Sequence, residues 1–195
     1  MNSFELIKSD LTRYSQLSSA QLSSAQLSST QPSFKTFVVN YLYNRSFKYN
    51  FWFRLTQSPS RPLSLIAKIR LKFLIWKTGI DIPPRTKIGY GFYIGHGQSI
   101  VVNPLTTIGN NCNISQFVSI GSNHGTGAVI GDDVYIGPNV CIVENVKIGN
   151  RVTIGAGAVV TKDIPDDATV AGVPAKVLNF KMPGRYIGNK YEAKK

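Results

Sequence analysis

The chain has two histidines, His96 and His124, and both lie in a stretch without charged side chains. No Asp, Glu, Lys or Arg occurs from Tyr90 to Ile130. A neutral imidazole can accept a proton at cellular pH, which makes histidine the commonest general base. His124 also falls in the Gly-rich segment 122–127, where a regular repeat is interrupted. The two histidines therefore mark the best candidate for a functional site in this sequence.

The sequence around them repeats an aliphatic residue at six-residue steps from Ile88 to Val160, usually with Gly after it. A period of six fits neither an α-helix nor an alternating strand. It is typical of a parallel β-helix built from hexapeptides. Three hexapeptides would make one triangular coil, which leaves room for roughly four coils. We expect the Gly residues to serve tight corners where the backbone angle φ is positive.

The repeat is interrupted twice, between Ile100 and Ile108 and between Ile120 and Ile130. Extra residues in a solenoid must leave the coil as loops. The second interruption contains His124, so we expect that histidine on a loop beside the regular coils.

The formal net charge of +12 is concentrated before the repeats, because residues 35–87 carry eleven Lys and Arg against Asp81 alone. The two cysteines, Cys112 and Cys141, have no paired spacing, so neither a disulfide framework nor a zinc site is indicated. No secretory signal or membrane-spanning stretch is evident. These features lead us to expect a cytoplasmic protein.

Residues 1–33 are expected to be a low-complexity, largely disordered tract, because residues 16–31 repeat QLSSA and are poor in branched apolar residues. A five-residue protein period is what a tandem five-nucleotide DNA repeat produces. We therefore hypothesise that this tract is a slippage site that gives phase variation.

Residues 34–79 are predicted to form a basic amphipathic helical segment. The helix from Leu63 to Lys77 places Ile66, Ile69, Phe73 and Trp76 at three- and four-residue steps. Two interpretations stay open: packing on the β-helix end or a neighbouring subunit, or contact of residues 35–77 with an anionic polymer or the inner face of a membrane. No nucleic-acid-binding motif is present, so nucleic acid is not expected as a partner.

Several segments together resemble the serine acetyltransferase branch of the hexapeptide-repeat acyltransferases. They are Gly79–Ile82, Ile88–Gly91, Ile94–Gly97, Ile154–Val160 and Ala171–Lys176. The resemblance covers about residues 79–178 and implies a mainly β fold, a left-handed parallel β-helix over 80–178, after the N-terminal α-helical segment and before a C-terminal tail at 179–195. It also implies a homotrimer that binds acetyl-CoA, the co-substrate, between subunits, with no metal.

The resemblance also implies roles for individual residues. His96 matches the general base on the acceptor hydroxyl, and Asp81 matches the carboxylate that orients it. His124 and Asn103 are the candidates for acceptor binding or for an alternative base, so the identity of the base stays open. The residues implied for acetyl-CoA are Ser122, Asn123, Pro138, Ala156, Lys162 and Lys176.

The chain departs from the serine-specific pattern at Gly95 and Pro104, where family members carry Asp and Glu, and at the loop where His124 stands without an adjacent Arg. We therefore predict O-acetylation of a sugar hydroxyl in a capsule or lipopolysaccharide, with a saccharide acceptor, similar to the acetyltransferases of those polymers. The alternatives are acetylation of serine or another small molecule, and a non-catalytic trimeric scaffold.

Overall fold

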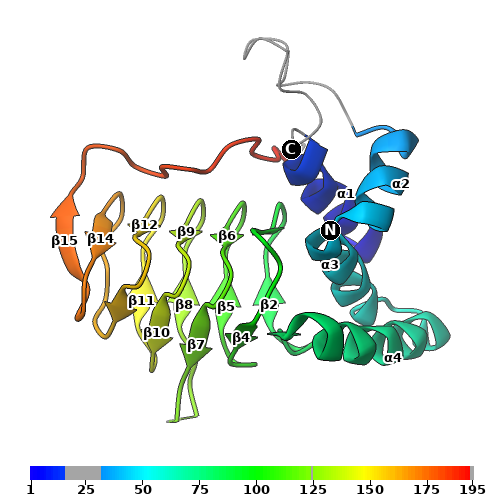
Figure 1. Ribbon diagram of the computed structural model, residues 1–195, viewed down its shortest axis with the longest axis horizontal. Coiled ribbons are helices and arrows are strands. Elements are labelled where there is room, and N and C mark those ends of the chain that lie inside the picture. Colours follow the sequence, from blue (N-terminus) through cyan, green and yellow to red (C-terminus); the bar gives the residue numbers. More distant parts are fainter. Residues whose placement is uncertain (16–31, 124, 194–195) are drawn as a thin grey trace.

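The computed structural model describes residues 1–15, 32–123 and 125–193, and its body is a three-sided prism of short strands with helices at one end (Figure 1). The helices cover the N-terminal end of the prism, while the C-terminal residues run back along its length toward α1. The four helices are α1 (Ser3–Tyr14), α2 (Phe34–Tyr43), α3 (Arg45–Thr56) and α4 (Arg61–Thr78). The repeat tract 16–31 and His124 lie outside the described residues.

The strands form three sheets, one for each side of the prism. Sheet A contains β1 (Ile80–Asp81), β4 (Ile100–Val102), β7 (Ser119–Gly121), β10 (Cys141–Val143) and β13 (Val159–Val160). Sheet B contains β2 (Lys87–Ile88), β5 (Thr107–Ile108), β8 (Val129–Ile130) and β11 (Lys147–Ile148). Sheet C contains β3 (Tyr93–Ile94), β6 (Asn113–Ile114), β9 (Tyr135–Ile136), β12 (Thr153–Ile154), β14 (Thr169–Ala171) and β15 (Lys176–Asn179).

The repeated aliphatic residues point inward and stack from coil to coil. In sheet B, Ile88 pairs with Ile108, Ile108 with Ile130 and Ile130 with Ile148, all in parallel register and all buried. Each coil adds aliphatic surface to one continuous core, which is the main stabilising contribution in a solenoid. The predicted left-handed parallel β-helix is confirmed, with about four coils and an N-terminal helical region.

The glycines that follow the aliphatic residues have a different role from the one predicted. Positive φ angles occur instead at other corner residues such as Asn111, Asp133 and Arg151. Several of the glycines, including Gly89, Gly131 and Gly149, are needed because successive coils lie close together. A Cβ atom at Gly109 would lie 2.6 Å from the carbonyl carbon of Gly131. The expectation of positive φ at these glycines was therefore wrong, and close approach of neighbouring backbones explains Gly109 and several equivalent glycines, though not Gly121.

Replacing Gly109 with Ala should lower the free energy of unfolding by about 1–3 kcal/mol, because the added methyl group overpacks two coils. Gly121→Ala is the matched control, since a Cβ atom there would meet nothing within 4 Å and its φ is not positive. Urea denaturation followed by circular dichroism measures both variants. Equal losses in the two variants would contradict the proposed role of close coil approach.

Residues 3–14 form helix α1, although the sequence led us to expect a largely disordered tract over 1–33. Asn2 and Glu5 form a capping box that fixes the start of the helix. Its buried face includes Ile7 and Leu11, which pack in a second hydrophobic cluster with α3. The division of the chain at residues 33, 79 and 178 otherwise stays a prediction.

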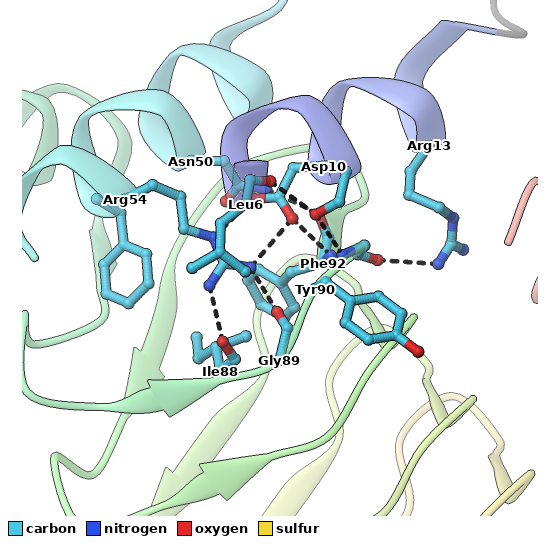
Figure 2. Close-up of polar contacts among 12 residues, drawn as sticks. Leu6, Asp10, Arg13, Asn50, Arg54, Ile88, Gly89, Tyr90 and Phe92 are labelled. Carbon is cyan, nitrogen blue, oxygen red and sulfur yellow. Dashed lines mark hydrogen bonds and ion pairs between the residues drawn. The ribbon is translucent and has the colours of Figure 1, made fainter. Parts of the chain in front are cut away.

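Figure 2 shows how a buried ion pair joins α1 and α3 to the first coil. Two side-chain nitrogens of Arg54 bond the Asp10 carboxylate, Nε at 2.8 Å and NH2 at 3.0 Å. The same guanidinium donates to the carbonyls of Ile88 and Gly89, while Asp10 accepts from the N–H of Phe92. Both side chains are almost fully buried. Burial raises the pKa of the Asp10 carboxyl, and the Arg54 charge opposes that shift.

Further side chains of α1 and α3 bond backbone groups of the same coil. Arg13 donates to the Gly91 carbonyl at 2.9 Å, and the Tyr14 hydroxyl accepts from the N–H of Ile94 at 2.9 Å. Asn50 donates to the Phe92 carbonyl, and Tyr49 accepts from the N–H of Ile82. These bonds satisfy backbone groups that no preceding coil can reach. We refer to α1 and α3 together as the N-terminal cap.

Replacing Asp10 with Ala should lower the free energy of unfolding by about 3–5 kcal/mol, because Arg54 would be left as a buried, unpaired charge. Lys8→Ala is the control on the same helix, because Lys8 is exposed and a surface change of this kind costs within about 0.5 kcal/mol. Urea denaturation measures both. A loss for Asp10→Ala no larger than that of the control would show that the ion pair does not hold the cap.

Candidate functional site

Most of the predicted site residues that the structure describes lie on edges of the prism, where one sheet turns into the next. His96, Pro138 and Ala156 share the edge between sheets C and A, which we call the C–A edge. Each stands two residues after a buried Ile of sheet C. Successive turns on this edge are joined by backbone bonds, such as that from the N–H of Gly157 to the Pro138 carbonyl at 2.9 Å. The predicted base and two predicted coenzyme residues therefore form one column.

Helix α3 fixes the turn that carries His96. Arg45 NH2 donates to the His96 carbonyl at 2.9 Å and to the side-chain carbonyl of Gln98 at 3.4 Å. Gly97 packs so closely on Ser46 that a Cβ atom there would overlap it. His96 itself has a φ of 56°, a left-handed conformation that needs such support outside glycine. The exposed His96 side chain is thus presented on a turn whose backbone is held by the cap.

A second group of predicted residues lies on the edge between sheets A and B, which we call the A–B edge. The Asn103 amide nitrogen donates to the Ser122 carbonyl at 3.2 Å, which joins the two predicted loops. Glu144 follows on the next coil and accepts from the Ser122 hydroxyl and the Asn123 N–H, each at 3.4 Å. Lys162 occupies the corresponding position one coil further on, two residues after the end of sheet A.

The third edge, between sheets B and C, is covered by the C-terminal tail. Asn111 bonds the backbone of Tyr191 in both directions, at 2.9 and 3.2 Å. Asp133 pairs with Lys190 at 2.8 Å, and the N–H of Gly184 bonds the Arg151 carbonyl. The tail in Figure 1 thus follows this edge back toward the cap. The C–A and A–B edges remain available for ligands.

Asp81 lies between those two edges, on the exposed face of sheet A. It pairs in register with Val101 of the next coil and its side chain points to solvent. Among the described residues, the structure gives no hydrogen bond between Asp81 and His96. About five residues of extended chain separate the edges across sheet A, which corresponds to roughly 15 Å. The structure therefore forms two separate groups of predicted residues, one on the C–A edge and one on the A–B edge. Within one chain the two groups are not joined into a single site.

The remaining predicted residues are not part of either group. Lys176 lies on β15, which pairs antiparallel with β14 at the far end of the prism. His124 is outside the described residues. Within residues 1–15, 32–123 and 125–193, no cluster of three His, Cys, Asp or Glu side chains could hold a metal ion. Cys112 is buried in the core, where burial raises the pKa of its thiol to about 12 and keeps it protonated.

Gln116 is a candidate that the sequence analysis missed. It stands two residues after Ile114, and so lies on the C–A edge between His96 and Pro138. Its side-chain carbonyl oxygen is buried and has no hydrogen-bond partner within the described structure. Buried polar atoms are normally satisfied, so an unsatisfied one in a candidate site is a candidate acceptor for a hydrogen bond from a ligand or a water molecule. Its position in the hexapeptide, equivalent to that of His96, was the signal available in the sequence.

Comparison with known proteins identifies relatives of the same architecture. The family described as Bacterial transferase hexapeptide (six repeats) matches residues 127–162. Serine acetyltransferase of Bacillus pumilus is 35% identical over 125 residues, 60% of this chain and 56% of that protein. Serine acetyltransferase of Staphylococcus epidermidis is 39% identical over 122 residues, 59% of this chain and 55% of that protein. The chain thus spans just over half the length of these curated relatives.

Solved structures give the same result over more of the chain. The Neisseria gonorrhoeae serine acetyltransferase, crystallised with serine, is 28% identical with a TM-score of 0.67 and covers 89% of this chain and 68% of its own. The soybean serine acetyltransferase complexed with serine is 27% identical with a TM-score of 0.68, and covers 91% of this chain and 70% of its own. The similarity therefore includes the helical cap as well as the prism.

These relatives overturn the prediction of a capsule or lipopolysaccharide acceptor, which was wrong. That prediction rested on missing side chains, namely Gly95, Pro104 and the lone His124. The relatives and solved structures described above are all named serine acetyltransferases, and not polysaccharide acetyltransferases. The saccharide acceptor and the phase-variation hypothesis have no support from them. Single missing contacts were a weak guide, because a small acceptor can be bound by other groups of the site.

Replacing Gln116 with Ala should raise the dissociation constant for coenzyme A about fivefold, the effect of losing one hydrogen bond. Isothermal titration calorimetry measures it, and the unfolding midpoint shows whether the fold is kept. Lys8→Ala is again the control, because Lys8 is exposed on α1 and belongs to neither edge. Unchanged affinity in the Gln116 variant would remove this residue from the coenzyme site.

Proposed function

We propose that the protein is an acetyl-CoA-dependent O-acetyltransferase and that serine is its acceptor. The observation that carries the proposal is the C–A edge, where His96, Gln116, Pro138 and Ala156 form one column. Coils are spaced about 4.8 Å apart, so this column is roughly 15 Å long. Such a length suits an extended pantetheine arm whose thioester lies beside His96. The similarity to serine acetyltransferases supports the same activity.

In the proposed reaction His96 removes the proton from the acceptor hydroxyl as its oxygen attacks the thioester carbonyl. The new C–O bond gives a tetrahedral intermediate, which a nearby backbone N–H can stabilise. The C–S bond then breaks, and the leaving sulfur takes the proton back from His96. An ester and coenzyme A are the products. Asp81 would orient the imidazole from the exposed face of sheet A.

We further propose that the active unit is a homotrimer. The coenzyme residues Ser122, Asn123 and Lys162 lie on the A–B edge, across sheet A from His96. A three-fold assembly can place the A–B edge of one copy against the C–A edge of the next, and every site is then shared. The tail occupies the third edge, so this arrangement leaves the tail outside the proposed sites.

Serine recognition requires a partner for its ammonium group. Gly95 and Pro104 provide no carboxylate, but Glu144 stands beside the loop at residues 122–123. We propose Glu144 as the carboxylate that faces the acceptor from the A–B edge.

We place the reaction in the cytoplasm. Among the described helices, none is both long and apolar enough to cross a membrane.

Replacing His96 with Ala should lower kcat for serine about 10²–10⁴-fold, the range for losing a general base, while coenzyme A binding is kept. Release of the free thiol gives the rate, and calorimetry gives the binding. His124→Ala serves as the comparison, since it tests the alternative base. A loss of turnover in the His124 variant with normal turnover in the His96 variant would reassign the base.

Two further outcomes of the same assay test the rest of the proposal. A wild-type protein that binds coenzyme A but does not acetylate serine would disprove the proposed acceptor. A wild-type protein that does not bind coenzyme A would favour the non-catalytic scaffold instead.

A further inference from the structure

Helix α4 presents two opposite faces. Ala67 and Leu71 are buried, and Leu74 and Ile75 pack beside them against α3 and the start of the prism. At 100° per residue these positions lie on one side of the helix. This inner face therefore accounts for how α4 is attached to the rest of the molecule.

The apolar residues noted in the sequence lie on the other face and are exposed. This outer stripe consists of Leu65, Ile66, Ile69, Phe73 and Trp76. Trp76 is 85% exposed and Phe73 is 67% exposed, large values for aromatic side chains. The five positions fall within an arc of about 100° that is opposite the inner face. Helix α4 does pack on the end of the β-helix, but through its inner face and not through these residues.

Basic side chains border the outer stripe on both sides. On a helix with 100° per residue, Lys68 and Lys72 fall along one border together with Arg61. Arg70 and Lys77 fall along the other border. All five are exposed, and residues 32–80 contain no Asp or Glu. The surface is therefore apolar along its centre and cationic along both margins.

We propose that the outer stripe of α4 binds the surface of an anionic lipid bilayer. Aromatic and aliphatic side chains would enter the headgroup region, and Lys and Arg would reach anionic headgroups from both margins. Trp is well suited to that boundary because one part of its ring is apolar and the other is polar. Figure 1 shows α4 extending from the end of the prism, so a bilayer could contact it without covering the three sheets.

The charge distribution argues against contact between the outer stripes of two copies of the chain. Two copies that joined through the outer stripe would bring their basic margins together, with no carboxylate in residues 32–80 to offset them. An anionic polymer would match the charges but would leave Phe73 and Trp76 unused. A bilayer is the occupant that uses both the apolar centre and the cationic margins.

This inference extends the proposed acetyltransferase by giving it a location, but its test measures lipid binding and does not depend on turnover. The full-length protein is sedimented with vesicles of phosphatidylcholine alone and with vesicles that also contain phosphatidylglycerol. We expect binding to the anionic vesicles, weakened by salt, and little binding to the neutral ones. Binding with equal strength to both kinds of vesicle, or to neither, would overturn the inference.

Two double variants separate the apolar and charged contributions. Phe73→Ser with Trp76→Ser, and Lys68→Gln with Lys72→Gln, should each weaken binding to anionic vesicles about tenfold or more. Leu178→Ser with Phe180→Ser is the matched control, because both residues are exposed at the far end of the prism. The four exposed α4 side chains can be changed without loss of packing, so the unfolding midpoint should stay the same.

The variants also distinguish the other occupants. A smaller assembly in the Phe73/Trp76 variant by analytical ultracentrifugation would assign the stripe to contact between copies and overturn the inference. Vesicle binding that depends on Lys68 and Lys72 but not on Phe73 and Trp76 would indicate a general anionic polymer surface and overturn it as well.

Discussion

The open end of the prism imposes the constraint on which the rest of the structure depends. A coil inside the prism has a neighbour on each side, but the first coil has backbone N–H and C=O groups that no preceding coil can bond. Leaving them buried and unpaired would cost roughly 1–3 kcal/mol each. Asp10, Arg54 and Tyr14 bond these groups directly, so α1 and α3 take the place of a missing coil. Charged side chains are used because one guanidinium can bond an ion-pair partner and two carbonyls together.

The same cap determines where chemistry can take place. The turn at residues 95–99 belongs to the first coil and is held by Arg45 and Ser46 at the start of α3. The tail occupies the edge between sheets B and C through Asn111 and Asp133. Two edges therefore remain, and each carries part of the predicted site. Because both edges are built on rigid coils, the groups on them are positioned before any ligand arrives.

The core was predictable because it depends on a local pattern repeated many times. The inward direction of each Ile can be predicted from the aliphatic residues six positions away, and the structure buries these Ile side chains as expected. Helix α1 was not predictable in this way. Asp10 and Arg13 look like surface residues, and their partners at Phe92 and Gly91 are distant in the sequence. The glycine positions were predicted but their reason was not, since contact between coils cannot be read from the torsional preference of a single residue.

The candidate site likewise has some features that a local sequence pattern predicts and others that depend on residues distant in the sequence. His96, Gln116, Pro138 and Ala156 occupy the same position of the hexapeptide, which places them in one column. A comparison of the residues at that position would therefore have identified Gln116 from the sequence. The acceptor does not follow from any such position. The saccharide acceptor was inferred from the carboxylates that Gly95 and Pro104 lack. Glu144, however, brings a carboxylate to the A–B edge, and the sequence around it did not indicate this position. Where a site is assembled from two edges, and in the proposed trimer from two copies, a missing group on one edge says little about the ligand.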